Sequence, residues 1–193
     1  MPSRTHARDP DETVIHRILR VNHAGEHGAI SIYSAQLAHL GTGRSDLRVW
    51  LEDTLDHERA HRAAFRGSMR ERDVTPCGAL AVWSIGGWVL GCLTALLGHR
   101  GVLACTAAVE RTVHGHLEEQ IAFLLRSDPA LAVLVQEIQR EEMGHLAYAE
   151  DRLPPGSITA RLIESVIAVC TGLLIALSTQ GASLTLNGAL RRG

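Results

Sequence analysis

The chain has 193 residues and a mass of 20.9 kDa, which suits one domain with a substantial hydrophobic core. Its 19 basic and 21 acidic residues give a formal net charge of −2, which argues against a strongly basic nucleic-acid-binding surface. All the basic residues are arginines, so the chain has no lysine for a phosphate-binding loop or a Schiff base. Its 11 histidines and many acidic residues are the side chains that a metal site needs.

The first twelve residues are polar and mixed in charge. They lack the apolar segment of a signal peptide, and their acidic residues argue against a transit peptide. We therefore expect residues 1–12 to form a disordered tail and residues 13–193 to form a single domain.

Helical periodicity dominates the rest of the chain, and no convincing strand pattern is present. Asp9 and Pro10 open the first helix, and Ser45 caps the second. Breaks rich in glycine, proline and serine divide the sequence into predicted helices at about residues 10–40, 46–72, 79–97, 102–126, 129–152 and 165–190.

The four cysteines have no CxxC spacing, and each lies in an apolar stretch. This favours buried free thiols and a reducing compartment over a disulfide framework. The residues concerned are Cys77, Cys92, Cys105 and Cys170.

Residues 79–97 carry no charge and could just span a bilayer core of ~30 Å at 1.5 Å per residue. Trp83 and Trp88, five residues apart near one end, also fit a helix that lies at a membrane interface. A third alternative is a helix buried in the bundle. We favour interfacial attachment. Residues 165–190 are also uncharged but contain several polar residues, which favours a packed terminal helix with one apolar face.

An internal repeat relates positions 84 residues apart. Each half reads Glu, then 31 residues, then Glu-x-x-His, which aligns Glu26 with Glu110, Glu58 with Glu142, and His61 with His145. In the first half, the two glutamates lie roughly 21 Å before and roughly 18 Å after a turn, so they reach a similar height on an antiparallel hairpin.

A Glu and a His three positions apart face the same side of a helix. A bundle that gathers one Glu from each of two helices and a Glu-x-x-His from each of the other two builds a di-iron or di-manganese carboxylate site. Four carboxylates offset most of the charge of two metal ions, and burying them unpaired would be very costly. The repeat therefore predicts an all-α four-helix bundle, built from an internal duplication, with a dinuclear metal centre.

Residues 57–61 also spell His-Glu-x-x-His, the signature of zinc proteases in which the Glu is a general base. The second half has Glu141 where this motif has its first histidine, so only the Glu-x-x-His part is repeated. This favours the dinuclear interpretation and leaves His57 facing solvent or supporting a ligand. A zinc metalloprotease stays an alternative.

Around these residues the chain resembles the demethoxyubiquinone hydroxylase family of ubiquinone biosynthesis. The resemblance covers about residues 12–165. It rests on both Glu-x-x-His elements and on residues 19–26 (LRVNHAGE), 91–98 (GCLTALLG) and 104–110 (ACTAAVE). The segment beyond about Ile163 is longer and more apolar than we expect of the family.

The resemblance implies a ferritin-like bundle with two iron ions. The di-iron centre would activate O2 and hydroxylate the ring of a polyprenylated demethoxy-quinol, as a 3-demethoxyubiquinol 3-hydroxylase. Glu58 and Glu142 are expected to bridge the ions, with Glu26 and Glu110 as terminal ligands. The positions that match the family's metal ligands are Glu26, Glu58, His61, Glu110, Glu142 and His145.

His116 matches a family position to which we assign electron or proton delivery. A tyrosine commonly follows this histidine in the family, whereas this chain has Leu117. Tyr33 is the repeat partner of Leu117 and is the local substitute, with a partly buried structural tyrosine as the alternative. His23 and His27 flank Glu26 and are either hydrogen-bonding supports of the ligands or simple polar helix positions.

A polyprenyl substrate lies in the bilayer, so an interfacial helix at residues 79–97 would let its head group reach the metal site without leaving lipid. We expect a peripheral protein on the cytoplasmic side of the bacterial inner membrane, acting on a polyprenyl quinol and O2. Other ubiquinone-biosynthesis proteins are expected partners, and nucleic acid is not.

No Gly-rich dinucleotide fingerprint follows a strand, so electrons are expected from a partner protein or from NADH bound without that motif. Two further alternatives stay open: a ferritin-like iron oxidase or storage protein, and a non-catalytic membrane accessory protein.

Overall fold

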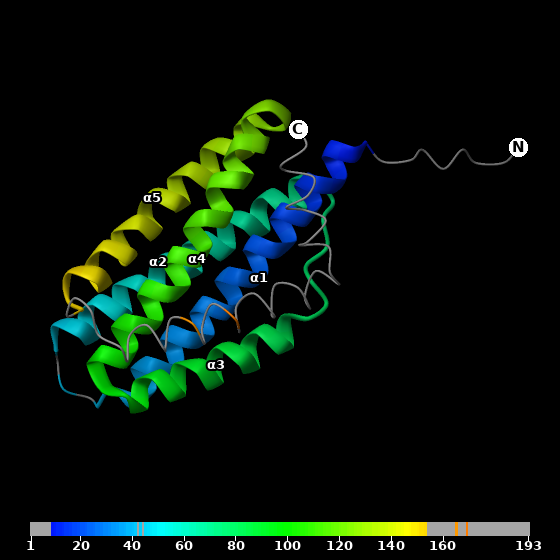
Figure 1. Ribbon diagram of the computed structural model, residues 1–193. Coiled ribbons are helices and arrows are strands. Elements are labelled where there is room, and N and C mark those ends of the chain that lie inside the picture. The colour runs from blue at the N-terminus through cyan, green and yellow to red at the C-terminus, as the bar shows by residue number, and fades with distance from the viewer. Residues whose placement is uncertain (1–8, 42, 44, 154–164, 166–168, 170–193) are drawn as a thin grey trace, which may run out of the picture.

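The computed structural model describes residues 9–41, 43, 45–153, 165 and 169. Within this part the chain is helical and has no strand, which confirms the predicted all-α fold (Figure 1). Its five helices are α1 (Pro10–His39), α2 (Asp46–Glu71), α3 (Leu80–Leu96), α4 (Gly98–Ser127) and α5 (Pro129–Asp151).

Short polar side chains fix the starts of three helices. The side chain of Asp9 accepts a hydrogen bond from the backbone N–H of Asp11, with Pro10 in the first helical position. Ser45 and Asp128 cap α2 and α5 in the same way. Because of the Asp9 cap, residues 10–12 form the first turn of α1, so the predicted tail extends too far. Residues 1–8 and nearly all of the predicted helix at 165–190 lie outside the described residues.

The corner between α3 and α4 is tighter than predicted. The sequence placed a break at residues 98–101, whereas α4 begins at Gly98 and only Leu97 separates it from α3. Gly98 has φ of 70°, a left-handed conformation that favours glycine, and it turns the chain directly into the next helix. A Cβ atom on Gly101 would meet the carbonyl oxygen of Thr94, so this glycine lets the two helices approach closely.

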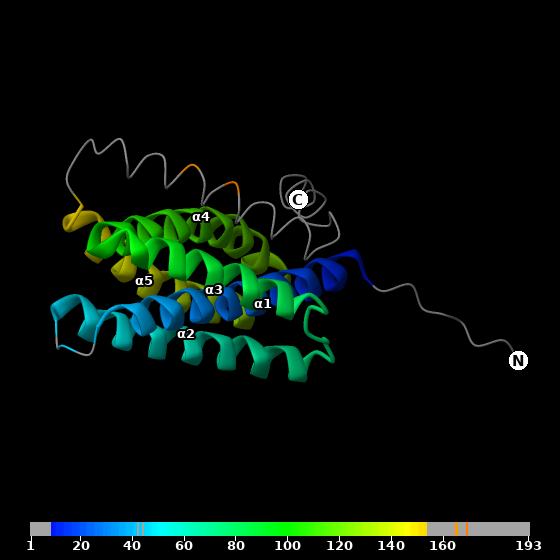
Figure 2. The ribbon, with the colours of Figure 1, turned by 90° about the horizontal axis from the view of Figure 1, so that it is seen from below.

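Four helices form the bundle, and α3 lies outside it (Figures 1 and 2). Helix α1 packs against α2, and α4 packs against α5, so each half of the 84-residue repeat is one helical hairpin. The hairpins meet through α1 with α4 and α2 with α5, while α3 packs mainly on α1 and also touches α4.

The apolar core is divided into two clusters. One contains Ile18, Leu19, Phe65, Met69, Leu124 and Leu131, and the other contains Tyr33, Leu51, Leu55, Val102 and Ala107. Along each bundle helix, the glutamate singled out by the repeat falls between residues of the first cluster and residues of the second. The polar centre is therefore enclosed by apolar packing on both sides.

A narrow strip of small residues attaches α3 to α1. A Cβ atom on Gly87 would lie 2.5 Å from the carbonyl oxygen of Gly28, and one on Gly91 would meet the carbonyl oxygen of Ile32. The ring of Trp83 covers Gly28, where a Cβ atom would lie 2.8 Å from it. The absence of side chains at these glycines allows the two backbones to touch.

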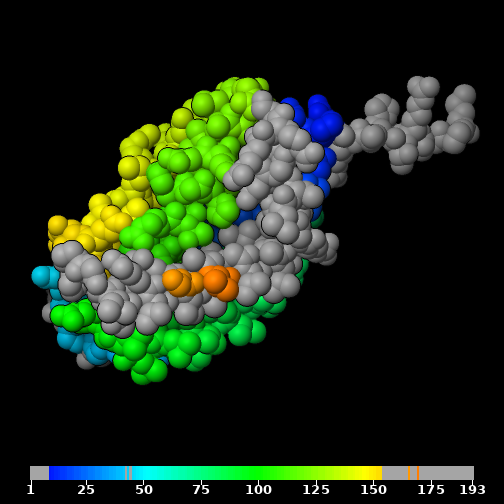
Figure 3. Space-filling view, in the orientation of Figure 1, coloured from blue at the N-terminus to red at the C-terminus, as the bar shows by residue number. Residues whose placement is uncertain are grey.

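The outer face of α3 is apolar and exposed. In the space-filling view, α3 forms the lower edge of the molecule (Figure 3). This exposure does not fit the alternative in which the segment is a helix buried in the bundle. Across the described residues, no helix is both long enough and apolar enough to cross a membrane. The exposed side chains are Val82, Ile85, Trp88, Val89, Leu93 and Leu96, followed by Leu97 at the corner.

The cysteine prediction is confirmed only in part. Of the three cysteines in the described part of the chain, only Cys105 is buried, while Cys77 and Cys92 are half-buried. Cys170 lies outside the described residues.

We predict that Gly91→Ala lowers the free energy of unfolding by about 1–3 kcal/mol, because a methyl group would press on the backbone of α1. Urea unfolding followed by circular dichroism measures the change. Gly67→Ala in α2 is the matched control, since nothing lies within 4 Å of a Cβ atom there, and it should stabilise the helix slightly. Equal stability of Gly91→Ala and the wild type would contradict the close approach of α3 to α1.

Candidate metal centre

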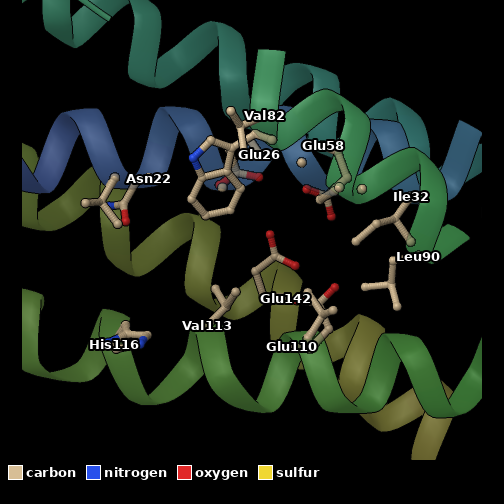
Figure 4. A pocket seen from close by; sticks show the side chains of 18 of the residues that line it. Asn22, Glu26, Ile32, Glu58, Val82, Leu90, Glu110, Val113, His116 and Glu142 are labelled. Atoms are coloured by element: carbon tan, nitrogen blue, oxygen red, sulfur yellow. The ribbon is translucent and has the colours of Figure 1, made fainter. Parts of the chain in front are cut away.

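Each bundle helix contributes one buried glutamate to the centre of the bundle. The exposed fractions are 8% for Glu26 and 3% or less for Glu58, Glu110 and Glu142. In Figure 4 the labelled carboxylates lie close together around the inner end of a pocket. The repeat predicted this convergence, and the two hairpins produce it.

The buried donors fall into two groups that could each hold a metal ion, with all ligand atoms of a group within 4.8 Å of one another. Two carboxylates, those of Glu58 and Glu142, belong to both groups, which is the arrangement of a dinuclear site with bridging ligands. One group is Glu26, Glu58, His61 and Glu142, and the other is Glu58, Glu110, Glu142 and His145.

The electrostatics of the glutamates fit a site for cations. Burial, with the charges of neighbouring carboxylates, raises the pKa of Glu58 and Glu110 well above the ordinary value. Burial and the charge of Glu142 also raise the pKa of Glu26 to about 7. The Oε1 atom of Glu58 is buried without a hydrogen-bond partner. Four carboxylates in this setting need positive charge, and metal ions would supply it.

Glu142 lies between the two histidines of the centre. The Nδ1 atoms of His61 and His145 are each 3.0 Å from one of its oxygens. Burial alone would raise the pKa of Glu142, but the hydrogen bond with His145 and the adjacent imidazole of His61 outweigh it and lower the pKa to about 2. Burial would likewise lower the pKa of His61, but Glu142 and Glu26 raise it to about 9. Both imidazoles thus present Nδ1 to the carboxylates.

The outer nitrogens of the two histidines have partners on the opposite hairpin. Nε2 of His61 lies 3.0 Å from Oε2 of Glu141, and Nε2 of His145 lies 3.1 Å from Nδ1 of His57. Sequence reasoning missed Glu141 and left His57 undecided. The repeat held the signal, since residues 57 and 141 are equivalent positions that directly precede Glu58 and Glu142.

The contact of His57 with His145 excludes the zinc-protease interpretation of residues 57–61. A zinc protease would need His57 and His61 on one ion, but the ring of His57 stacks on His145, with centroids 5.3 Å apart. His57 belongs to neither group of candidate ligands.

Tyr33 contacts the centre directly. Its hydroxyl donates a 2.7 Å hydrogen bond to Oε1 of Glu110, and the side chain is buried. Burial and the neighbouring Glu110 raise the pKa of Tyr33 well above the ordinary value, which keeps the hydroxyl protonated. Its repeat partner, Leu117, offers no hydroxyl to Glu26. Tyr33 is not among the residues that line the pocket, so it touches a candidate ligand rather than the space for a substrate.

A cavity of about 620 Å³ leads from the glutamates to α3 (Figure 4). Its walls are mainly apolar and come from α1, α3 and α4. Ile85 and Leu93 line it and are also exposed, so the cavity reaches the surface along α3. The four glutamates share this cavity with Asn22, Ile32, Val82, Leu90, Val113 and His116, among others.

His116 lies on the cavity wall, away from the carboxylates (Figure 4). It follows Glu110 by six residues, a rise of about 9 Å along the helix. Burial lowers its pKa, although Glu119 opposes the shift, so the ring is neutral near pH 7. The structure thus places His116 beside the space for a substrate but outside both groups of candidate ligands.

His27 is engaged away from Glu26. Its Nε2 lies 2.6 Å from the hydroxyl of Ser84, and its Nδ1 accepts a hydrogen bond from Arg62, so it links α1 to α2 and α3. Nδ1 of His23 is buried without a hydrogen-bond partner, and burial with nearby Arg66 lowers the pKa of His23 to about 4. Neither residue is among the candidate ligands.

Sequence reasoning also missed a pair of buried amides. Asn22 and Gln120 donate to each other over 2.7 and 3.2 Å and join α1 to α4 beside the cavity. The match of Gln36 with Gln120 in the repeat was the available signal.

A family model described as "Ubiquinone biosynthesis protein COQ7" matches residues 13–178. The chain belongs to the COQ7 family. The match continues past residue 165, where the resemblance in the sequence ended, so the first part of the apolar terminal segment is also shared with the family.

Similar members of the COQ7 family come from animals and bacteria. A Mus musculus protein named "NADPH-dependent 3-demethoxyubiquinone 3-hydroxylase, mitochondrial" is 33% identical over 163 residues, 80% of this chain and 74% of its own length. A "3-demethoxyubiquinol 3-hydroxylase" of Rhodospirillum rubrum is 38% identical over 138 residues, 70% of this chain and 65% of the relative. The Homo sapiens protein with the same printed name as that of the mouse is 38% identical over 135 residues, 68% of this chain and 61% of the relative.

The buried carboxylates predict that the metal-free protein loses stability as the pH rises from about 5 to about 8. The pKa of Glu26 is about 7 in the folded protein against an ordinary 4.5, so the folded state binds more protons than the unfolded state in this window. The raised pKa values of Glu58, Glu110 and His61 act in the same direction. The lowered pKa of His23 opposes them only below about pH 6.5, where histidine in the unfolded chain takes up a proton. The shift at Glu26 alone is worth about 3 kcal/mol.

Urea unfolding of metal-free protein at several pH values measures this effect. Addition of Fe(II) under anaerobic conditions should stabilise the protein most at the higher pH, because the metal replaces protons on the carboxylates. Metal-free protein that is as stable at pH 8 as at pH 5 would contradict the electrostatic description of the centre.

Proposed function

We propose that this chain hydroxylates the ring of a polyprenylated demethoxy-quinol with O2 at a di-iron centre, as a step of ubiquinone biosynthesis. The proposal rests on where the candidate metal ligands lie. Two groups of buried ligands that share Glu58 and Glu142 lie at the inner end of an apolar cavity. Membership of the COQ7 family and the hydroxylase names of the relatives support the same reaction.

The proposed ligands suit iron because they combine carboxylate oxygens with two imidazole nitrogens. Glu58 and Glu142 would bridge the ions, since each belongs to both groups, and Glu26 and Glu110 would each bind one ion. Bound iron would supply the redox chemistry that activates O2.

The protein residues around the centre have separate tasks in this proposal. Tyr33 holds Glu110 through its hydroxyl and keeps the carboxylate in one orientation. The apolar cavity wall binds the substrate ring and its tail and excludes water. His116, neutral and on the cavity wall, is placed to exchange a proton with the head group of a bound quinol.

The cavity favours a hydroxylase over a ferritin-like iron oxidase or storage protein. A volume of about 620 Å³ lies within the usual range of about 300–1,000 Å³ for small-molecule sites. Storage of iron would require neither an apolar cavity nor an opening along an exposed apolar helix.

Reduced nicotinamide nucleotide, NADH or NADPH, is our proposed electron source, used directly or through a partner protein. The names of several relatives include NADPH dependence. The described part of the chain has no strand and so no βαβ nucleotide-binding unit, which means that such a cofactor would bind in another way.

Peripheral contact with a membrane is the role that we propose for α3. Its exposed apolar face borders the mouth of the cavity, so a polyprenyl tail could stay in lipid while the head group enters. The relatives include mitochondrial and bacterial proteins. For this chain we propose the cytoplasmic side of a bacterial inner membrane, where other ubiquinone-biosynthesis proteins would be its neighbours.

We predict that the purified protein carries two iron ions per chain and complements a strain blocked at ring hydroxylation. Glu110→Ala should remove hydroxylation, because it deletes a ligand from one position. Mass spectrometry of the accumulated quinone gives the readout, and Glu118→Ala, at an exposed position of α4, is the control. Full activity without iron, or in Glu110→Ala, would contradict the proposed mechanism.

A second prediction concerns the membrane. The double variant Trp88→Ser/Leu96→Ser should weaken binding to phospholipid vesicles at least tenfold, because each lost side chain contributes about 1.5–3 kcal/mol when fully buried. Neither residue lines the cavity, so the chemistry should survive with a soluble short-tail quinol. Leu125→Ser/Val133→Ser, at equally exposed positions of α4 and α5, is the control in vesicle co-sedimentation. Unchanged vesicle binding would exclude α3 as the contact.

A further inference from the structure

The contacts behind the two histidines cross between the hairpins. His57 on α2 reaches the outer nitrogen of His145 on α5, and Glu141 on α5 reaches the outer nitrogen of His61 on α2. Residues 57 and 141 are equivalent in the repeat, so the two contacts are the same contact made twice. The residues that make them differ in charge.

The partner of His61 is a carboxylate. Nε2 of His61 lies 3.0 Å from Glu141 while Nδ1 faces the centre, so an ion bound at Nδ1 would leave the ring proton on Nε2, where Glu141 can accept it. A carboxylate acceptor on the far nitrogen orients an imidazole and makes it a stronger donor to a metal ion.

The partner of His145 is an imidazole, with further aromatic rings close by. Nε2 of His145 lies 3.1 Å from Nδ1 of His57, and the two rings stack with 14° between their planes. The ring of Trp50 is nearly perpendicular to that of His145, with ring centroids 6.3 Å apart, and Trp50 itself stacks on Tyr148. An imidazole acceptor polarises His145 less than a carboxylate would.

Tyr33 adds a second difference between the two groups of ligands, and it too weakens the group of His145. Its hydroxyl donates to Glu110, which belongs to the group of His145. A carboxylate oxygen that accepts this hydrogen bond has less electron density to give to a metal ion. Leu117, at the equivalent position, makes no such bond to Glu26, which belongs to the group of His61.

We propose that the two metal positions are inequivalent, and that the position of His61 binds its ion more tightly and fills first because Glu141 supports it where His57 supports the other. The proposal rests on the dinuclear centre proposed above. Glu141 and His57 are positioning residues, since they act on the ions only through the two histidines. The rest of the donor set favours neither position, because Glu58 and Glu142 are shared.

An exchange of the two supporting residues tests this directly. The variant H57E/E141H has the same composition and net charge as the wild type, but it places the carboxylate behind His145. Both side chains are exposed, so the exchange leaves the core unchanged. Metal-free full-length protein is loaded with one equivalent of Co(II), and anomalous diffraction from its crystals shows which position is occupied.

In the wild type, we expect Co(II) mainly at the position of His61, with a difference in affinity of about 10-fold to 100-fold between the two titration steps. In H57E/E141H the preference should weaken or reverse. H57E alone should tighten the second step, and E141Q should weaken the first step while the second stays the same. E137Q, at an exposed position on the same helix as Glu141, is the control and should change neither step.

Equal occupancy of both positions in the wild type would overturn the inequivalence while leaving a dinuclear centre in place. An undiminished preference for the position of His61 in H57E/E141H, or an unchanged first step in E141Q, would show that the supporting residues do not set the order. If Co(II) binds at neither position, the proposed metal centre itself is wrong.

Discussion

The burial of four carboxylates at one level of a helical bundle is the constraint on which the rest of the structure depends. Like charges at this spacing repel one another, and burial removes the water that would screen them. Apolar clusters on both sides hold the helices together across this unfavourable layer. Hydrogen bonds between Asn22 and Gln120 and between Tyr33 and Glu110 fix α1 against α4. The bundle therefore holds buried carboxylates that need either protons or bound cations to balance their charge.

Helix α3 converts this centre into a site with access. Gly87 and Gly91 let the backbone of α3 touch α1, so α3 closes one side of the cavity. Trp83 points inward, while Ile85, Trp88 and Leu93 are exposed on the outer face. The same helix thus forms part of the cavity wall and part of the exposed apolar surface. Larger residues in place of Gly87 and Gly91 would move α3 outward and open the cavity to water. The glycines therefore matter to the chemistry although none is a candidate ligand.

The fold class and the convergence of the six candidate ligands could be predicted from the sequence, because the repeat and the helical period carry that information directly. Sequence reasoning misplaced the start of α4, since glycines near residues 98–101 predicted a break, whereas Gly98 in a left-handed conformation turns the chain directly into the next helix. For residues 79–97 it favoured interfacial attachment on the tryptophan spacing alone, because a segment without charges has no polar face to orient it. The contacts of His57, Glu141 and Tyr33 also escaped it, since they arise where side chains of different helices meet.

The arrangement of two similar hairpins has a consequence for symmetry. A pair of identical hairpins, associated as separate chains around a two-fold axis, would have to surround both metal ions with the same groups. Joining the hairpins in one polypeptide removes that obligation, so single positions can diverge without loss of the shared frame. Two pairs of equivalent positions carry different residues: His57 and Glu141, and Tyr33 and Leu117. The covalent link between α2 and α4, made through α3, thus allows the two groups of candidate ligands to have different surroundings, which a symmetric dimer could not provide.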